Sequence, residues 1–138
     1  MMVFKVDNFV AREHIVAKFL ELGFIIKDEK FNKIYFEKGC HLGYLEIALQ
    51  NAGVFYLRIA KPNHVDILNC LMNDLNRFKL SIPIDGINLQ TKEKINFIDY
   101  VGLKEHYKKS QEEYVKWYPD IPYPVRCDDI PKYRQLHF

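Results

Sequence analysis

The chain has 138 residues, of which 49% are hydrophobic and 28% charged, and this length and composition are typical of one folded domain. Its formal net charge of +2 comes from interspersed acids and bases, which argues against a dedicated polyanion-binding protein. The three cysteines are far apart and predict reduced thiols rather than a disulfide framework or a zinc site. We therefore expect a single domain over residues 1–138, without a membrane span or secretory signal, in the cytoplasm.

An amphipathic helix is predicted near the start of the chain, over residues 8–22. Asp7 or Asn8 can cap its first amides, and Gly23 is placed to end it in a left-handed conformation. One helical stripe is formed by Phe9, Val16, Phe19 and Leu20. We expect this stripe to face the core.

Four strands are predicted to follow, as two hairpins. Alternation with a period of two begins at Phe24 and continues to Glu37, with a break near residues 30–32. It returns over residues 44–49 and 54–60, on either side of a turn that contains Gly53. The buried face of the second hairpin is predicted to carry Leu45, Ile47, Leu49, Phe55, Leu57 and Ile59.

A second helix is predicted after Pro62, with Asn63 as its cap and Asp66 reaching back to the cap amide. It should end before Pro83. Its apolar side chains recur at helical spacing and comprise Val65, Leu68, Leu71, Met72, Leu75 and Phe78.

The last third of the chain predicts a short strand, a helix and an extended arm. The strand lies in residues 84–97, where Asp85–Gly86 has the form of a tight turn. A helix is predicted over residues 97–118, weakened at Gly102 and polar in its middle. Residues 119–138 contain four prolines among aromatic side chains and predict an extended, irregular arm.

These elements predict an α+β fold with an antiparallel meander sheet of four to five strands and about three helices packed mainly on one face. The helices then bury one face of the sheet. The other face must be solvated, covered by the arm, or used for binding.

The sequence contains no recognisable motif for catalysis, metal binding or nucleotide binding. The histidines lack ligand spacing, and the glycines form no phosphate-binding loop, so we expect no metal and no cofactor. A small hydrolase or nuclease is an alternative, with a site assembled from His41, His64 or His106 and a distant acid.

Nucleic-acid binding is another alternative. The predicted strands carry aromatic residues near Arg58, which is the combination that single-stranded nucleic-acid platforms use: Tyr35, Phe36, Tyr44, Phe55 and Tyr56. The aromatic and basic sequence pattern of the common RNA-recognition domains is missing, and the charge is almost neutral. Core packing is the better explanation for one set of these alternating aromatics.

The arm and the residues just before it predict a protein-binding surface. Trp117, Tyr118, Tyr123 and Arg126 are of the types enriched at interface hot spots, and the prolines lower the entropy lost on ordering. Packing of the arm on its own domain is the alternative. By elimination, we expect a small non-enzymatic domain that binds another protein. Bacterial immunity proteins, which neutralise toxins by direct binding, have a similar size and architecture, although no residue motif supports that analogy.

Overall fold

The computed structural model describes residues 1–6, 10–40, 42–50, 53–59 and 63–119. Within these residues the elements are, in chain order, β1 (Met2–Val6), α1 (Arg12–Glu21), β2 (Ile25–Lys30), β3 (Lys33–Cys40), β4 (Gly43–Leu49), β5 (Val54–Arg58), α2 (Ile67–Ser81), β6 (Ile84–Asn88) and α3 (Val101–Trp117). None of these described helices is long and apolar enough to cross a bilayer.

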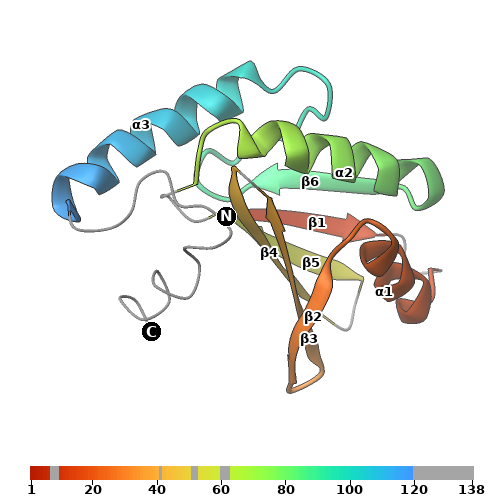
Figure 1. Cartoon of the computed structure of the whole chain (residues 1–138). Coiled ribbons are helices and arrows are strands. Elements are labelled where there is room, and N and C mark those ends of the chain that lie inside the picture. Colours follow the sequence, from red (N-terminus) through yellow and green to blue (C-terminus); the bar gives the residue numbers. More distant parts are fainter. Residues whose placement is uncertain (7–9, 41, 51–52, 60–62, 120–138) are drawn as a thin grey trace.

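The strands form one antiparallel sheet in the order β2-β3-β4-β5-β1-β6. Helices α1 and α2 lie on one side of the sheet, and α3 extends past the end of α2 (Figure 1). The predicted α+β class and antiparallel sheet are confirmed. The described strands number six rather than four to five, and the meander is limited to β2 through β5.

Strand β1 is absent from the sequence prediction, although it pairs with β5 on one side and β6 on the other. Met2, Phe4 and Val6 are buried, whereas Lys5 between them is exposed. An alternation over only five residues is a weak signal for a strand. The strand β1 forms because it pairs with two strands that are distant in sequence, and local residues do not reveal that pairing.

The core joins both helices to the sheet through phenylalanine rings. The ring centroid of Phe19 on α1 lies 5.0 Å from that of Phe78 on α2, and 5.1 Å from those of Phe36 and Phe55 on the sheet. Aromatic pairs at such distances contribute beyond the area that they bury. One residue of α1 therefore connects three elements.

Helix α1 begins at Arg12, later than predicted, with Ala11 at its cap and no side-chain cap. The proposed caps and Phe9 lie outside the described residues. Gly23 has a φ of +97° and ends the helix as predicted. The predicted stripe is wrong at Leu20, which is exposed, because Ile15 and Leu22 turn toward the core instead.

Helix α2 confirms the predicted apolar stripe but not the predicted cap. It begins at Ile67, with Asp66 at the cap position and no capping side chain. The side chain of Asn63 is buried and bonds the backbone of Tyr44 on β4 instead, so its assignment as cap was wrong. A tertiary partner outcompetes the local one here.

The predicted turn at Asp85–Gly86 is also wrong, because both residues lie inside β6. Gly86 faces Phe4 on the neighbouring strand, and a Cβ at this position would stand 2.4 Å from the ring. The glycine is therefore required by close packing rather than by a turn. Helix α3 starts at Val101, after the predicted residue 97.

The turn between β2 and β3 places Phe31 at φ +50° and Asn32 at φ +66°, and Phe31 is 96% exposed. A side chain with a Cβ costs about 1–2 kcal/mol in this left-handed region, which asparagine tolerates. We predict that Phe31→Asn raises the free energy of unfolding by about 0.5–1 kcal/mol. Urea titration measures this. Phe31→Ala is the matched control, and equal stability of the two variants would contradict the strain argument.

Candidate functional site

The side of the sheet opposite α1 and α2 carries a cavity of about 400 Å³. At its centre Tyr35, Ala48 and Tyr56 stand in register on β3, β4 and β5. Glu46 on β4 and Arg58 on β5 occupy the neighbouring row, where the two residues stand directly opposite each other in the strand register. All five residues line the cavity, and we call this surface the open face.

A bulge in β2 shapes one border of the open face. The register with β3 shifts between Ile26 and Asp28, so that Lys27 is the extra residue. Asp28 is opposite Tyr35, and the Nζ of Lys27 reaches Glu37, which lies on the same face as Tyr35, although consecutive residues of a regular strand would point to opposite sides. The bulge therefore adds a second charged side chain to the same surface.

Ion pairs within the chain engage part of this border. The Nζ of Lys27 lies 3.8 Å from an Oε of Glu37, and the Nζ of Lys30 lies 3.3 Å from an Oδ of Asp28. These four charges offset one another. Recognition of a charged partner therefore depends mainly on Glu46 and Arg58, which carry the charges at the centre of the open face.

Four side chains of the open face make no hydrogen bond or ion pair with any other residue in the described part of the chain: Tyr35, Glu46, Tyr56 and Arg58. Glu46 and both tyrosines are half-buried, and Arg58 is exposed. Partly desolvated polar groups gain most from a partner that satisfies them. This arrangement suits a ligand with an apolar or flat group and charges of both signs.

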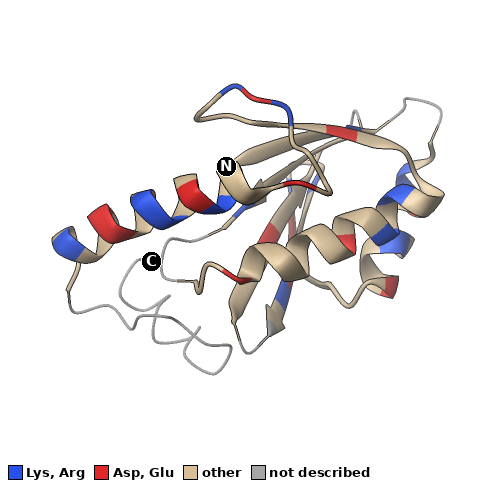
Figure 2. Cartoon of the chain, turned by 90° about the horizontal axis from the view of Figure 1, so that it is seen from above, with Lys and Arg blue, Asp and Glu red and all other residues tan. Residues whose placement is uncertain are grey.

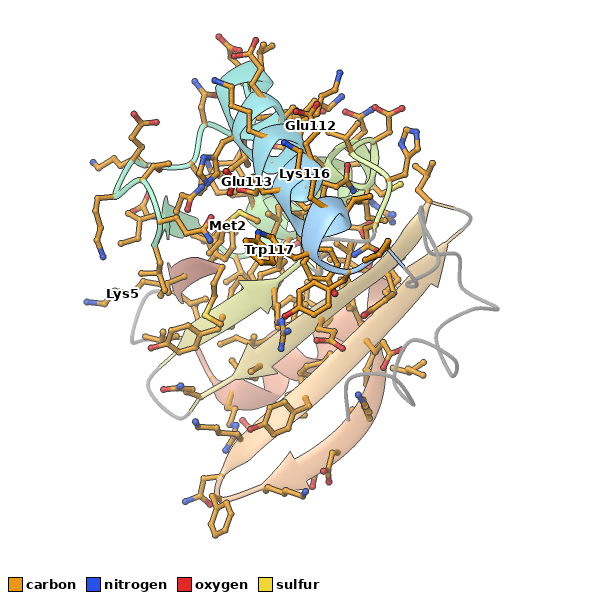
Figure 3. All side chains as sticks on the ribbon, turned by 90° about the vertical axis from the view of Figure 1, so that its left-hand side faces the viewer. Met2, Lys5, Glu112, Glu113, Lys116 and Trp117 are labelled. Atoms are coloured by element: carbon orange, nitrogen blue, oxygen red, sulfur yellow. The ribbon has the colours of Figure 1, made fainter. Side chains whose placement is uncertain are left out.

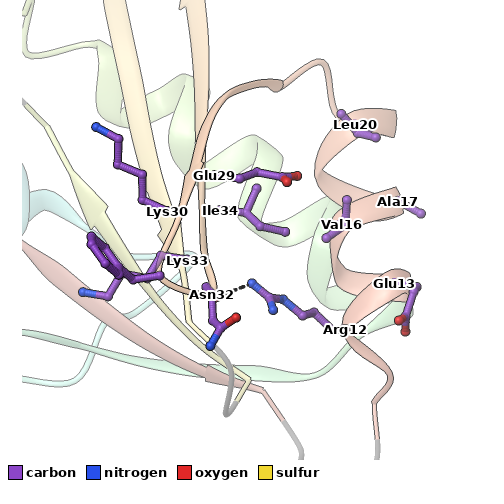
Figure 4. A pocket seen from close by; sticks show the side chains of 11 residues that line it. Arg12, Glu13, Val16, Ala17, Leu20, Glu29, Lys30, Asn32, Lys33 and Ile34 are labelled. Atoms are coloured by element: carbon purple, nitrogen blue, oxygen red, sulfur yellow. Dashed lines mark hydrogen bonds between the residues drawn. The ribbon is translucent and has the colours of Figure 1, made fainter.

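A second hollow, of about 500 Å³, separates α1 from the β2–β3 hairpin. The guanidinium of Arg12 donates to the backbone carbonyl of Asn32 across it, which ties the hairpin tip to the helix (Figure 4). Its wall includes the alkyl side chains of Val16, Leu20 and Ile34. Because this hollow lacks a comparable gathering of aromatic rings, the open face is the stronger candidate.

Two of the predicted partner-binding residues, Trp117 and Tyr118, lie apart from the open face. Trp117, the last residue of α3, is 80% exposed (Figure 3), and Tyr118, at its C-terminal cap, is 51% exposed. The ring of Tyr118 lies 4.9 Å from that of Tyr114, and neither Trp117 nor Tyr118 lines the cavity. Tyr123 and Arg126 lie outside the described residues.

The aromatic strand residues divide between the two faces of the sheet. Phe36, Tyr44 and Phe55 are buried, whereas Tyr35 and Tyr56 belong to the open face. Sequence reasoning did not identify Glu46 as a site residue. The available signal was its position between Leu45 and Ile47, since a charged residue between two core residues of a strand must point to the other face.

The histidines do not converge in the described part of the chain. His64 lies 3.6 Å from Asp66, two residues along, and the backbone amide of Asp66 donates to its Nδ1. His106 contacts the side chain of Gln90 at 2.8 Å. His41 lies outside the described residues. None of the described histidines, His14, His64 and His106, lines the open face, and the described residues contain no group of three potential metal ligands.

Charges of both signs are mixed over the surface of the described elements. Figure 2 shows Lys and acidic residues following one another along α3, with both signs also present elsewhere in this view. A field of this kind does not favour one sign of partner.

A comparison of the chain with protein-family models, curated proteins and solved structures found no match.

Proposed function

We propose that this chain is a small protein-binding domain that recognises its partner through the open face. The observation that supports the proposal is the cavity in which Tyr35, Glu46, Tyr56 and Arg58 have no partner among the described residues. Tyrosine and arginine are among the residues that contribute most at protein interfaces, because they bring area and hydrogen bonds together.

The charges favour a protein over a nucleic acid as the partner. A nucleic acid offers phosphates to Arg58, but it brings them toward Glu46, which is directly paired with Arg58 in the sheet. The half-buried carboxylate would then lose water without gaining a cation. A protein can present both an acid and a base, and so satisfy both side chains.

We further propose that binding is the activity itself. Among the described residues His64 and His106 do not converge on the open face, and a domain that presents such a surface acts most simply by covering the working surface of its partner. An intracellular inhibitor, such as a bacterial immunity protein that neutralises a toxin, fits this description by its size and by the nature of its surface. This class remains our proposal for the chain.

Trp117 and Tyr118 are the proposed second contact region. Their exposure at the end of α3 leaves large aromatic surface in water, which binding would remove. Tyr123 and Arg126 follow in the sequence and are proposed to extend the same contact.

The test is affinity capture from the native lysate with tagged wild type, a Tyr35→Ala/Tyr56→Ala variant and a Trp117→Ala variant. We expect the wild type to retain one stoichiometric protein and the tyrosine variant to lose it. Inhibition is then measured by adding the domain to the purified partner, whose activity should fall to zero near a 1:1 ratio. Phe31→Ala is the matched control, since it also removes an exposed aromatic side chain, away from the open face.

Retention that is unchanged in the tyrosine variant would exclude the open face. Retention that disappears after nuclease treatment or at high salt would instead assign the chain to nucleic-acid binding, because phosphate contacts depend steeply on salt. All variants are first shown to unfold cooperatively, so that a lost contact is distinguished from a lost fold.

A further inference from the structure

We infer that the space between Tyr35 and Tyr56 is a slot for an arginine side chain of the partner protein, an inference that rests on the proposed function. The two tyrosines are in register with Ala48, which lies between them on the middle strand. Neighbouring strands are about 4.8 Å apart, so the tyrosine backbones are separated by about 10 Å. The alanine methyl group leaves the space between the two rings open above it.

The width of this slot suits one flat group. Atoms in optimal contact lie about 3.5–4 Å apart, so a planar group held between two rings needs about 7–8 Å. The backbones of the two tyrosines are about 10 Å apart, so their rings hold one flat group in contact when they lean toward each other by about 2–3 Å in total. A guanidinium or an aromatic ring then contacts both rings, whereas a thicker saturated ring would keep them further apart.

The charge of the slot selects between a guanidinium and a neutral ring. Glu46 precedes Ala48 by two residues on β4 and therefore lies on the same face, at one end of the slot. It has no ion pair within the described residues. A neutral ring would shield this half-buried carboxylate from water without compensation, whereas a cation would pair with it.

Arginine fits better than lysine because its planar guanidinium can stack on a tyrosine ring and donate to a carboxylate at the same time. Arg58 is the opposing charge. It is exposed, so water and salt screen its repulsion, while the attraction by half-buried Glu46 is screened less. The long side chain of Arg58 can also turn outward, toward an acidic residue next to the incoming arginine.

The test uses the folded chain, labelled with ¹⁵N, and capped pentapeptides with a central arginine, citrulline or lysine flanked by glycines. We expect the arginine peptide to shift the amide resonances of Ala48, Tyr35 and Tyr56, with a dissociation constant on the order of 1–10 mM. Citrulline keeps the planar shape without the charge, so its peptide should bind at least about tenfold more weakly. Lysine should fall between them.

Glu46→Gln should weaken the arginine peptide about tenfold, whereas Glu112→Gln on α3 should leave it unchanged. Equal binding of the arginine and citrulline peptides, or no shift with the arginine peptide at about 20 mM, overturns the inference. Shifts caused by a single-stranded oligonucleotide instead would assign the slot to base stacking, and also overturn it. If the peptides fail while the captured partner still depends on Tyr35 and Tyr56, the slot is refuted and the proposed function stands.

Discussion

Replacing Lys38 by methionine should lower the free energy of unfolding by about 3–5 kcal/mol, because it leaves a buried carboxylate without its cation. The Nζ of Lys38 on β3 lies 2.8 Å from an Oδ of Asp74 on α2. It also donates to the backbone carbonyl of Leu22 at 2.7 Å, at the C-terminal end of α1. One ammonium group therefore connects the sheet with both helices of the core, and urea titration followed by circular dichroism measures its contribution.

The two partners should respond unequally, since they differ in access to water. The side chain of Asp74 is 5% exposed, whereas that of Lys38 is 26% exposed. In Asp74→Asn the ammonium retains the Leu22 carbonyl and can turn toward solvent, so we expect a smaller loss of about 1–3 kcal/mol. In Lys38→Met the carboxylate has no such route.

Two further variants separate the ion pair from packing. Lys38→Met combined with Asp74→Leu should be within about 1–2 kcal/mol of the wild type, because a well-packed apolar pair often replaces a buried ion pair at little cost. Lys79→Met removes an exposed lysine on α2, whose Nζ lies 4.5 Å from the centroid of the Phe97 ring, and should cost less than about 1 kcal/mol. A loss in Lys38→Met no larger than in Lys79→Met contradicts the argument.

Local periodicity was enough to predict the helices and the central strands. The alternation of β4 and the stripe of α2 arise from long runs in which burial on one side repeats many times. It was not enough for β1, which was missed, or for the interior of β6, where a turn was expected within the predicted short strand. Gly86 illustrates why: its nearest neighbour in the fold is Phe4, more than eighty positions earlier, and the sequence contains no local mark of that contact.

The candidate site was only partly predictable, for a similar reason. Tyr35, Tyr56 and Arg58 were noticed as aromatic and basic strand residues, and the predicted buried face of the second hairpin puts Tyr56 and Arg58 on the opposite face, but the alignment of Tyr35 with Ala48 and Tyr56 depends on the strand register. The face of Glu46 follows from its position between Leu45 and Ile47, but its cross-strand neighbours, Glu37 and Arg58, are given only by the strand pairing. Trp117 and Tyr118 were singled out from composition as partner-binding residues, whereas their exposure at the end of α3 and their position relative to the open face depend on tertiary structure.

Gly43→Ala should lower the free energy of unfolding by at least about 3 kcal/mol, because the position is unfavourable in two ways. Gly43 has a φ of +133°, and a Cβ there would stand 1.9 Å from the Oδ1 of Asn63. That oxygen accepts the backbone amide of Tyr44 at 2.8 Å, while the side-chain amide of Asn63 donates to the carbonyl of Tyr44 at 3.0 Å. The methyl group would therefore strain the backbone and displace a fully buried pair of hydrogen bonds.

Asn63 also fixes α3, since its backbone carbonyl accepts the hydroxyl of Tyr107 at 3.0 Å and the side-chain amide of Gln111. Displacement of Asn63 should therefore loosen α3, which hydrogen exchange of its amides measures independently of global unfolding. In an Asn63→Ala background the clash partner is gone, so Gly43→Ala should cost at least about 1 kcal/mol less than in the wild type. Strict additivity of the two substitutions would contradict the clash and leave only the strain at Gly43 as the cause.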